Sequence, residues 1–177
     1  MYCIREILTL EKQKLVIKNV NSDSFDIIRS IAYKSWPVAY GKILSDAQLQ
    51  WMLANFYSDK SLQQNIDDNH LFYILENDNV ALGFFAVEHH YKNEATSRLH
   101  KLYLNPETQT KGFGKKILGF IEAQCLQNSA KTLSLNVNKF NKAVGFYEKM
   151  GFEIVRSEVI EIGNGFFMDD FQMEKQI

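Results

Sequence analysis

The spacing of apolar and polar residues predicts strands and helices along almost the whole chain. Alternating or short continuous apolar runs predict strands at residues 14–20, 71–76, 80–88, 97–104, 132–137, 153–160 and 166–175. Apolar residues three and four apart predict helices that begin near residues 21, 45, 61, 113 and 141. The order of the main elements, β-α-α-β-β-β-α-β-α-β-β, predicts an α/β fold with a mixed sheet and helices on both faces.

Local signals place some ends of these elements. The segment from Ser45 to Gln48 matches a capping box, which predicts that a helix begins there. Pro37 restricts the residue before it, so we predict that the first helix ends near Trp36. Residues 36–41 then form a connection between two helices, which either packs on the core or lines a binding site.

The stretch 97–121 carries the strongest chemical signal. A strand ends before Pro106, and a bend with two glycines then leads directly into a helix. Glycine lets the backbone turn sharply and lets a ligand come close. The first N–H groups of a helix lack intrahelical partners and lie at the positive end of its dipole, so they favour an anion. Three lysines add positive charge and complete the predicted pyrophosphate site: Lys111, Lys115 and Lys116.

Other glycine motifs fit this stretch less well. A dinucleotide fingerprint needs a third glycine where Ile117 stands and an earlier place in the chain, and no Gly-x4-Gly-Lys-Ser/Thr loop is present. Lys111-Gly-Phe-Gly resembles the start of an RNA-recognition motif, but Lys115 and Lys116 stand where an aromatic strand would continue. A helix that simply begins after a glycine-containing loop is the plainer alternative.

Two ordered motifs carry a family resemblance. Gln109-x-x-Gly112-x-Gly114 follows one predicted strand, and the next strand is followed by Asn138, Asn141, Phe146-Tyr147 and Gly151-Phe152. At this spacing they resemble the acetyl-CoA motif and the Asn…Phe-Tyr…Gly-Phe signature of the GCN5-related N-acetyltransferase (GNAT) superfamily. The resemblance covers about residues 14–174 in element order. It implies a GNAT-like mixed, mostly antiparallel central sheet.

The resemblance implies acetyl-CoA as co-substrate. A strand end would pair with its pantetheine arm, the bend would bind its pyrophosphate, and two asparagines would face it between parted strands. The expected acetyl-CoA-binding residues are Leu102, Tyr103, Leu104, Gln109, Thr110, Lys111, Gly112, Phe113, Gly114, Lys115, Asn138, Asn141 and Tyr147. Thr110 replaces a glycine common in the family, which makes one backbone approach to phosphate less open. A helix N-cap role would by itself explain Asn141.

The resemblance also implies where the acceptor binds. Family members bind acceptors beside the connection at 36–41, so Trp36 and Tyr40 are the expected substrate-binding residues. Carboxylates on flanking elements would attract a cationic amine, although exposed carboxylates are usually only a solvated surface. They are Asp23, Asp26, Glu158, Glu161, Asp169 and Asp170.

Acetyl transfer to an amine needs a group that accepts the amine's proton and one that protonates the departing thiolate. Tyr147 is the expected general acid, because a phenol with a reference pKa of ~10 needs little tuning to protonate a thiolate of ~8.5. A core tyrosine with a satisfied hydroxyl is the alternative. His100 is the expected catalytic base, with its side chain on the same face as Leu102, and a buried structural histidine is the alternative.

Other histidines and metals give weaker hypotheses. Glu88, His89 and His90 end another strand and would act as a base only through water. We expect no metal, because His89-His90 has no third ligand at a recognisable spacing and no His-Glu-x-x-His motif is present.

Composition limits the remaining choices. A chain of 177 residues predicts one domain, 1–177, in which residues 1–13 form an extension without a clear family counterpart. The net charge of −1 argues against nucleic acid as a partner, and no apolar run approaches membrane-spanning length. The segment from Met1 does not match a signal peptide, and Cys125 lies on an apolar helix stripe, so a buried thiol and a cytoplasmic location are expected.

The expected function is transfer of the acetyl group of acetyl-CoA to a primary amine, by direct attack in a ternary complex. The acceptor would be a small amine, a polyamine or a peptide amine, and a homodimer is an open option because family members often pair. Two alternatives stay open. One is a catalytically idle acyl-CoA-binding or sensor module, and the other is an RNA-binding domain.

Overall fold

The computed structural model describes residues 15–109 and 111–177, so the extension predicted for residues 1–13 lies outside the described residues. The described residues form one seven-stranded sheet in the order β1-β2-β3-β4-β5-β7-β6. Its strands are β1 (Leu15–Val20), β2 (Leu71–Asn77), β3 (Val80–Glu88), β4 (Thr96–Leu104), β5 (Thr132–Asn138), β6 (Glu153–Gly163) and β7 (Phe166–Gln176). Neighbouring strands are antiparallel except β4 and β5, which are parallel.

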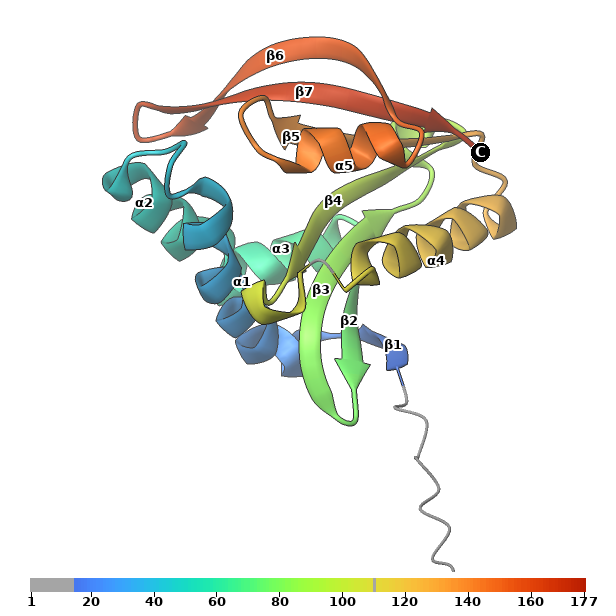
Figure 1. The fold of residues 1–177 in the computed structure, drawn as a ribbon, viewed down its shortest axis with the longest axis horizontal. Helices are drawn as coiled ribbons and strands as arrows, with labels where there is room; N and C mark the ends of the chain where they lie inside the picture. Colours follow the sequence, from blue (N-terminus) through green and yellow to red (C-terminus); the bar gives the residue numbers. More distant parts are fainter. Residues whose placement is uncertain (1–14, 110) are drawn as a thin grey trace, which may run out of the picture.

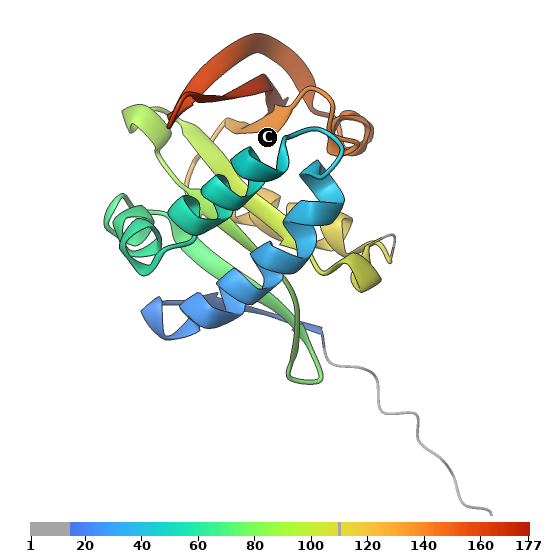
Figure 2. The same ribbon diagram turned by 90° about the vertical axis from the view of Figure 1, so that its left-hand side faces the viewer.

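Helices cover both faces of this sheet (Figures 1 and 2). They are α1 (Phe25–Tyr40), α2 (Asp46–Phe56), α3 (Asp59–Asp67), α4 (Phe113–Gln127) and α5 (Ala143–Lys149), with short 3-10 turns η1 (Ser22–Ser24), η2 (Tyr91–Asn93) and η3 (Pro106–Thr108). One core cluster contains the apolar faces of α1, α2 and α3, and a second contains those of α4 and α5. The predicted fold class is confirmed.

The pairing of β4 with β5 ends early. Residues 96–99 of β4 pair with residues 132–135 of β5, although β4 continues to Leu104 and β5 to Asn138. Beyond Leu99 the two strands therefore part within the described chain. Backbone groups of the last residues of β4 are left without a strand partner on that side, and α4 begins beside the opening.

The prediction that Pro37 ends the first helix is wrong. Helix α1 continues through Pro37 to Tyr40, and the Gly41 N–H donates to the Pro37 carbonyl at 3.0 Å. Proline removes one helical hydrogen bond, but Trp36 and Tyr40 are 4% and 8% exposed in the α1–α3 core. Burial of two aromatic side chains outweighs the lost bond, since each is worth a few kcal/mol, on the order of 2 or more. Residues 36–40 are therefore the last turn of a helix.

Two contacts join α2 to the turn of the β6–β7 hairpin. The Ser45 hydroxyl accepts from the Gln48 N–H at 3.2 Å, as a helix N-cap does, whereas the Gln48 side chain donates to the Phe167 carbonyl at 2.7 Å. Trp51 packs on Phe166 with ring centroids 5.8 Å apart. The hairpin turn consequently rests on α2 (Figure 1).

Cys125 is a buried free thiol on α4, as predicted. No helix formed by residues 15–109 or 111–177 is long and apolar enough to cross a membrane.

Candidate active site

The opening between β4 and β5 is bounded at one end by a fixed corner. Asn105 follows β4, and its side chain donates to the Ala81 carbonyl at 2.9 Å while its N–H donates to the Leu82 carbonyl at 2.8 Å. The Thr108 hydroxyl donates to the Asn105 carbonyl at 2.7 Å. These bonds tie residues 105–108 to the end of β4 and to β3, next to the opening.

The segment predicted to bind pyrophosphate leads into the first turn of α4. Gly112 has φ +77°, a left-handed conformation that favours glycine, and a Cβ there would meet nothing within 4 Å. Among the described residues no side chain caps the N-terminus of α4, so the N–H groups of its first turn are left without an intrahelical partner. Gly114 lets the helix approach α5, because a Cβ would come within 3.0 Å of the Phe146 ring. Thr110 lies outside the described residues.

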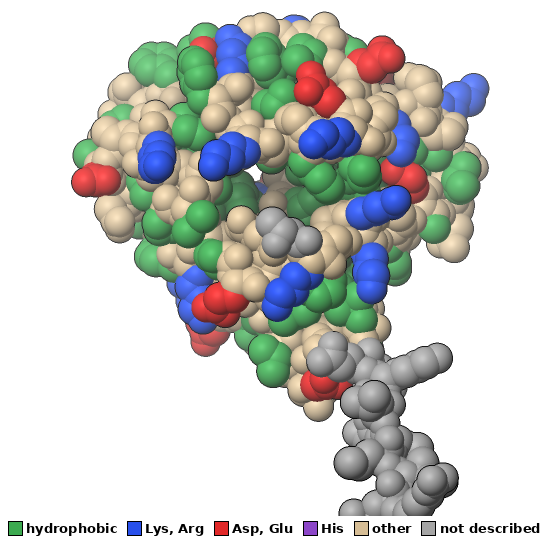
Figure 3. Space-filling model, viewed as in Figure 1, with side chains coloured by type: hydrophobic (Ala, Val, Ile, Leu, Met, Phe, Trp, Pro, Cys, Tyr) green, Lys and Arg blue, Asp and Glu red, His purple; other side chains and the backbone are tan. Residues whose placement is uncertain are grey.

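Positive charge surrounds this corner. Lys111 and Lys115 are exposed, and Lys116 Nζ lies 5.9 Å from the centre of the Phe113 ring. Figure 3 shows Lys and Arg side chains around a hollow in the middle of the same face of the molecule. A free helix N-terminus, a glycine backbone and flexible ammonium groups together suit a diphosphate.

Tyr147 lies on α5 with its ring in the α4–α5 core. It is 8% exposed and packs on Phe152 and Phe146, with ring centroids 5.5 and 5.3 Å apart. Burial raises the pKa of Tyr147, and the nearby Tyr40 hydroxyl adds to the effect, so the phenol is protonated at neutral pH. The described residues form no hydrogen bond to its hydroxyl, which distinguishes it from a core tyrosine with a satisfied hydroxyl.

A cluster of aromatic side chains connects α1 to β4. Trp36 contacts Tyr40 and Tyr103 with ring centroids 4.9 and 5.6 Å apart, and the Tyr40 and Tyr103 hydroxyls lie 3.4 Å apart. The Trp36 ring N–H donates to the Tyr57 hydroxyl at 3.1 Å. The structure therefore brings the two predicted substrate-binding residues against Tyr103. The sequence indicated Tyr103 for its backbone alone, because no local signal shows that its side chain meets α1.

Asn138 and Asn141 make local hydrogen bonds at the start of α5. The Asn138 side chain accepts from the Phe140 N–H at 3.1 Å, and the Asn141 side chain accepts from the Ala143 N–H at 2.9 Å. The capping alternative for Asn141 is thus supported by a bond near the helix start. Binding of acetyl-CoA by these two residues stays a prediction.

His100 does not lie where the alternation of β4 places it. Ala86 of β3 pairs with Lys101 and Val87 with Leu99, so His100 is the extra residue of a β-bulge. Its Nε2 lies 2.8 Å from a Glu88 carboxylate oxygen, and its ring stacks on His70 with centroids 3.7 Å apart.

The bulge changes the face on which His100 lies. Lys101 pairs with Ala86, a residue of the α1–α3 core, whereas Leu102 packs against the α4–α5 core. Glu88, the partner of His100, lies two residues from Ala86 and so on the α1–α3 face. The expectation that His100 shares a face with Leu102 is therefore wrong. Burial, together with nearby His70, Lys101 and Arg98, lowers the pKa of His100 to about 2, so this imidazole is neutral and weakly basic.

The described chain contains one group of three side chains that could ligate a metal, with donor atoms within 4.8 Å of one another: His70, Glu88 and His100. Two positively charged side chains near this group disfavour the binding of a metal cation. Lys101 and Arg98 both lower the pKa of the His100 imidazole. Burial lowers the pKa of Lys101 to about 8, which still leaves much of it charged at neutral pH. The absence of a bound metal stays a prediction. His89 is engaged elsewhere, with its Nδ1 2.7 Å from the Ser97 hydroxyl.

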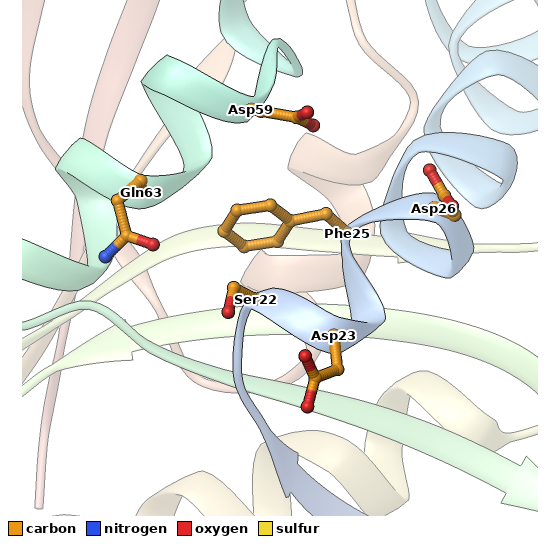
Figure 4. Close-up of a pocket in the computed structure, with 6 residues that line it drawn as sticks. All are labelled: Ser22, Asp23, Phe25, Asp26, Asp59 and Gln63. Atoms are coloured by element: carbon orange, nitrogen blue, oxygen red, sulfur yellow. The ribbon is translucent and has the colours of Figure 1, made fainter.

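The carboxylates named from the sequence fall into separate places. Asp23 and Asp26 line a pocket with Asp59 at the beginning of α1, as Figure 4 shows, and Arg29 pairs with Asp26 and Asp59. Tyr40 ends the same 16-residue helix, about 24 Å away along its axis. This pocket is therefore remote from the opening between β4 and β5. Asp169 pairs with Lys139.

Asp170 differs from the other carboxylates. It lies opposite Asn138 in the β5–β7 register and is 8% exposed. Burial raises its pKa to about 6, and Glu158 and Asp169 add to the effect. The sequence did not separate Asp170 from its neighbours, because only the sheet register shows which of them reaches the opening.

Comparison with known proteins identifies the class. The family model of the acetyltransferase (GNAT) domain matches residues 42–175, and the chain belongs to this family. The chain is 34% identical over 99 residues to the [ribosomal protein bS18]-alanine N-acetyltransferase of Haemophilus influenzae, across 56% of this chain and 66% of that protein. It is 39% identical over 64 residues to the peptidyl-lysine N-acetyltransferase YjaB of Salmonella typhimurium, across 35% of this chain and 41% of that protein. The chain thus spans less than two thirds of the length of either relative.

A solved structure shows the same fold over nearly the whole chain. The PaiA N-acetyltransferase of Thermoplasma acidophilum, crystallised in complex with coenzyme A, superposes with a TM-score of 0.77 at 25% identity. The match covers 93% of this chain and 99% of that protein.

Proposed function

We propose that this protein is an acyl-CoA-dependent N-acetyltransferase that moves the acetyl group of acetyl-CoA to a primary amine. The observation that carries the proposal is the parting of β4 and β5 beside the uncapped N-terminus of α4. The parted strand supplies unpaired backbone groups for an extended amide-containing arm, and the helix N-terminus supplies N–H groups for a diphosphate. Acetyl-CoA contains both parts. The coenzyme A in the structure of the PaiA relative supports this choice.

In the proposed arrangement, the β4 backbone at Leu102, Tyr103 and Leu104 holds the pantetheine arm. The segment from Gln109 to Lys115 binds the pyrophosphate, and Asn138 and Asn141 line the opposite side of the opening. The acetyl group then lies near the buried tyrosine cluster. Trp36 and Tyr40 form the wall from which the acceptor approaches.

The reaction would proceed by direct attack in a ternary complex. The amine nitrogen loses a proton and forms a bond to the thioester carbonyl carbon, and the C–S bond then breaks. Tyr147 gives its phenolic proton to the departing thiolate, for which its protonated state and unbonded hydroxyl suit it. His100 is the base that the sequence offers, but a pKa near 2 makes it a poor proton acceptor.

The acceptor class follows from the same site and from the relatives. The two curated relatives are named for acetylation of an alanine of a ribosomal protein and of peptidyl lysine. We therefore include a peptide α-amine, a lysine side chain and a polyamine among the acceptors to be tested. A cytoplasmic location and a homodimer belong to the same proposal, since the buried free thiol of Cys125 fits a reducing compartment and members of the family often pair.

Two measurements separate the proposal from its alternatives. Stabilisation of the chain by acetyl-CoA in a thermal melt, without stabilisation by RNA, supports an acyl-CoA site and excludes the RNA-binding domain. Release of coenzyme A thiol with an amine panel then supports catalysis. Stabilisation by acetyl-CoA without turnover of any amine at millimolar concentration would leave the idle sensor module instead.

A further inference from the structure

One buried carboxylate near the opening has no partner among the described residues. Asp170 is 8% exposed, and its Oδ1 accepts no hydrogen bond. Its neighbour Asp169 pairs with Lys139, and Glu158 across the sheet accepts from Asn136 and Arg156. Buried carboxylates are normally paired in this way, because transferring a charged group out of water costs free energy unless a partner replaces its hydration. A carboxylate kept buried and unpaired in such surroundings is suited to receive a ligand.

The sheet places Asp170 on the side from which an acceptor approaches. Met168, two residues earlier on β7, packs in the α1–α3 core, so the side chain of Asp170 lies on the same face. Asp170 pairs with Asn138, the last residue of β5, where β5 no longer pairs with β4. It therefore lies at the open part of the sheet. Tyr40 on α1 is close enough that the Asp170 charge raises the pKa of its hydroxyl.

The charged groups around Asp170 leave a cation to be supplied from outside. From β6, Glu158 stands directly opposite, and Asp169 precedes it on its own strand. The positive charges of Arg98 on β4 and Lys139 after β5 lower the pKa of Asp170, whereas the two carboxylates raise it. Lys139 is paired with Asp169, however, and Arg98 lies against Ser134. The ammonium group of an amine has three N–H donors. The Asp170 carboxylate and the nearby tyrosine hydroxyls offer acceptors for them.

We propose that Asp170 binds the ammonium group of the acceptor and takes the proton that this group must lose before it attacks the thioester. The inference rests on the proposed function and narrows it to alkyl amines, which are cationic at neutral pH. One proton moves from the ammonium nitrogen to the Asp170 carboxylate, and the freed nitrogen lone pair forms the new C–N bond. As the C–S bond breaks and Tyr147 protonates the thiolate, the nitrogen of the adduct loses its second proton, which restores the Tyr147 phenol. Asp170 is thus the catalytic base in place of His100.

The test compares Asp170→Asn with a matched variant, Glu174→Gln. Glu174 lies on the same strand and the same face, bonded to Gln172 at 2.9 Å, but opposite Ser134, where β4 and β5 still pair. The substrate is the alkyl amine that the wild type acetylates fastest. We expect Asp170→Asn to lower kcat/KM by 100-fold or more and Glu174→Gln to change it less than threefold. Stabilisation by acetyl-CoA should be equal in all three proteins.

The pH profile adds a readout that a structural role would not change. Wild-type kcat/KM should fall as pH decreases through about 6, where Asp170 becomes protonated, and this acid limb should be absent from the residual activity of Asp170→Asn. Asp170→Asn with kcat/KM within threefold of the wild type, or with an unchanged acid limb, overturns the inference while leaving the proposed function intact. If the fall of kcat/KM at acidic pH disappears in His100→Gln and not in Asp170→Asn, the catalytic base is His100. A wild type inactive with every amine would refute both proposals.

Discussion

Replacing Asp170 with asparagine should stabilise the folded chain at neutral pH even though it removes activity. The variant keeps the shape of the side chain and removes a charge that is buried without a partner. Burial raises the pKa of this carboxyl from 3.8 to about 6, which means that ionisation is less favourable in the folded state than in the unfolded state. The ionised group therefore opposes folding.

The size of the effect follows from that pKa difference. A difference of about 2 pH units corresponds to ~3 kcal/mol, because each unit is worth ~1.4 kcal/mol. Residual contact with water reduces this, so we expect a gain of about 2 kcal/mol in the free energy of unfolding. For a domain of this size, that gain raises Tm by roughly 4–8 °C.

The pH dependence gives the sign of the effect. Near pH 4 the wild-type carboxyl is largely protonated in the folded state, and asparagine offers little advantage. The unfolded carboxyl ionises from about pH 3.8 and the folded one only from about pH 6, so the wild type loses stability between these two pH values. The gain from asparagine therefore grows over this interval and stays at its full value above it, as at about pH 7.5. Thermal melts of Asp170→Asn, Glu174→Gln and the wild type at pH 4, 5.5 and 7.5 measure this. A gain that is absent at pH 7.5, or equal at all three values, would refute the argument.

Three further predictions concern the donor side and the metal question. Tyr147→Phe should lower kcat by ~100-fold or more with unchanged stabilisation by acetyl-CoA, because it removes the proposed proton donor while keeping the buried ring; turnover and thermal melts measure the two effects. Gly112→Ala should lose ~1 kcal/mol of stability and much of the acetyl-CoA-dependent increase in Tm, because φ is +77° there. Treatment with EDTA should leave turnover and Tm unchanged, because Lys101 and Arg98 lie beside the His70–Glu88–His100 group.

Each of these has a control within the chain. Gly119→Ala in α4 also meets nothing within 4 Å but needs no left-handed backbone, so it should keep acetyl-CoA binding and gain up to ~1 kcal/mol. Equal effects of the two glycine variants would contradict a special role of the Gly112 backbone. Full turnover by Tyr147→Phe would remove Tyr147 from the mechanism. For the metal, if EDTA abolishes the activity of the wild type and Zn²⁺ restores that activity, and if Zn²⁺ restores none in His70→Ala, then the His70–Glu88–His100 group binds an ion.

The sequence predicted the element order and the bend before α4 because both depend on neighbouring residues. Strand alternation, helical spacing and the two glycines are local signals, and the structure confirms the fold class that they imply. Pro37 was misread because the decision to continue α1 depends on Trp36 and Tyr40 meeting distant residues. The steric rule for proline is local, but the burial that outweighs it is not.

The site was less predictable than the fold for the same reason. The bulge at His100 is a mismatch between β3 and β4, so it is invisible in either strand alone. Asp169 and Asp170 are adjacent and chemically equal in the sequence, yet one pairs with Lys139 and the other faces the opening. Only the pairing of β7 with β5 separates them.

The hairpin turn that rests on α2 has a consequence for how such a protein can change. Gln48 and Trp51 hold that turn, while the glycines and lysines of the α4 corner lie on another part of the chain. Substitutions at residues 163–167 can therefore change how this turn packs on α2 without altering the glycine backbone of the α4 corner. In a lineage with this architecture, the hairpin turn and the α4 corner can therefore vary in sequence independently of each other.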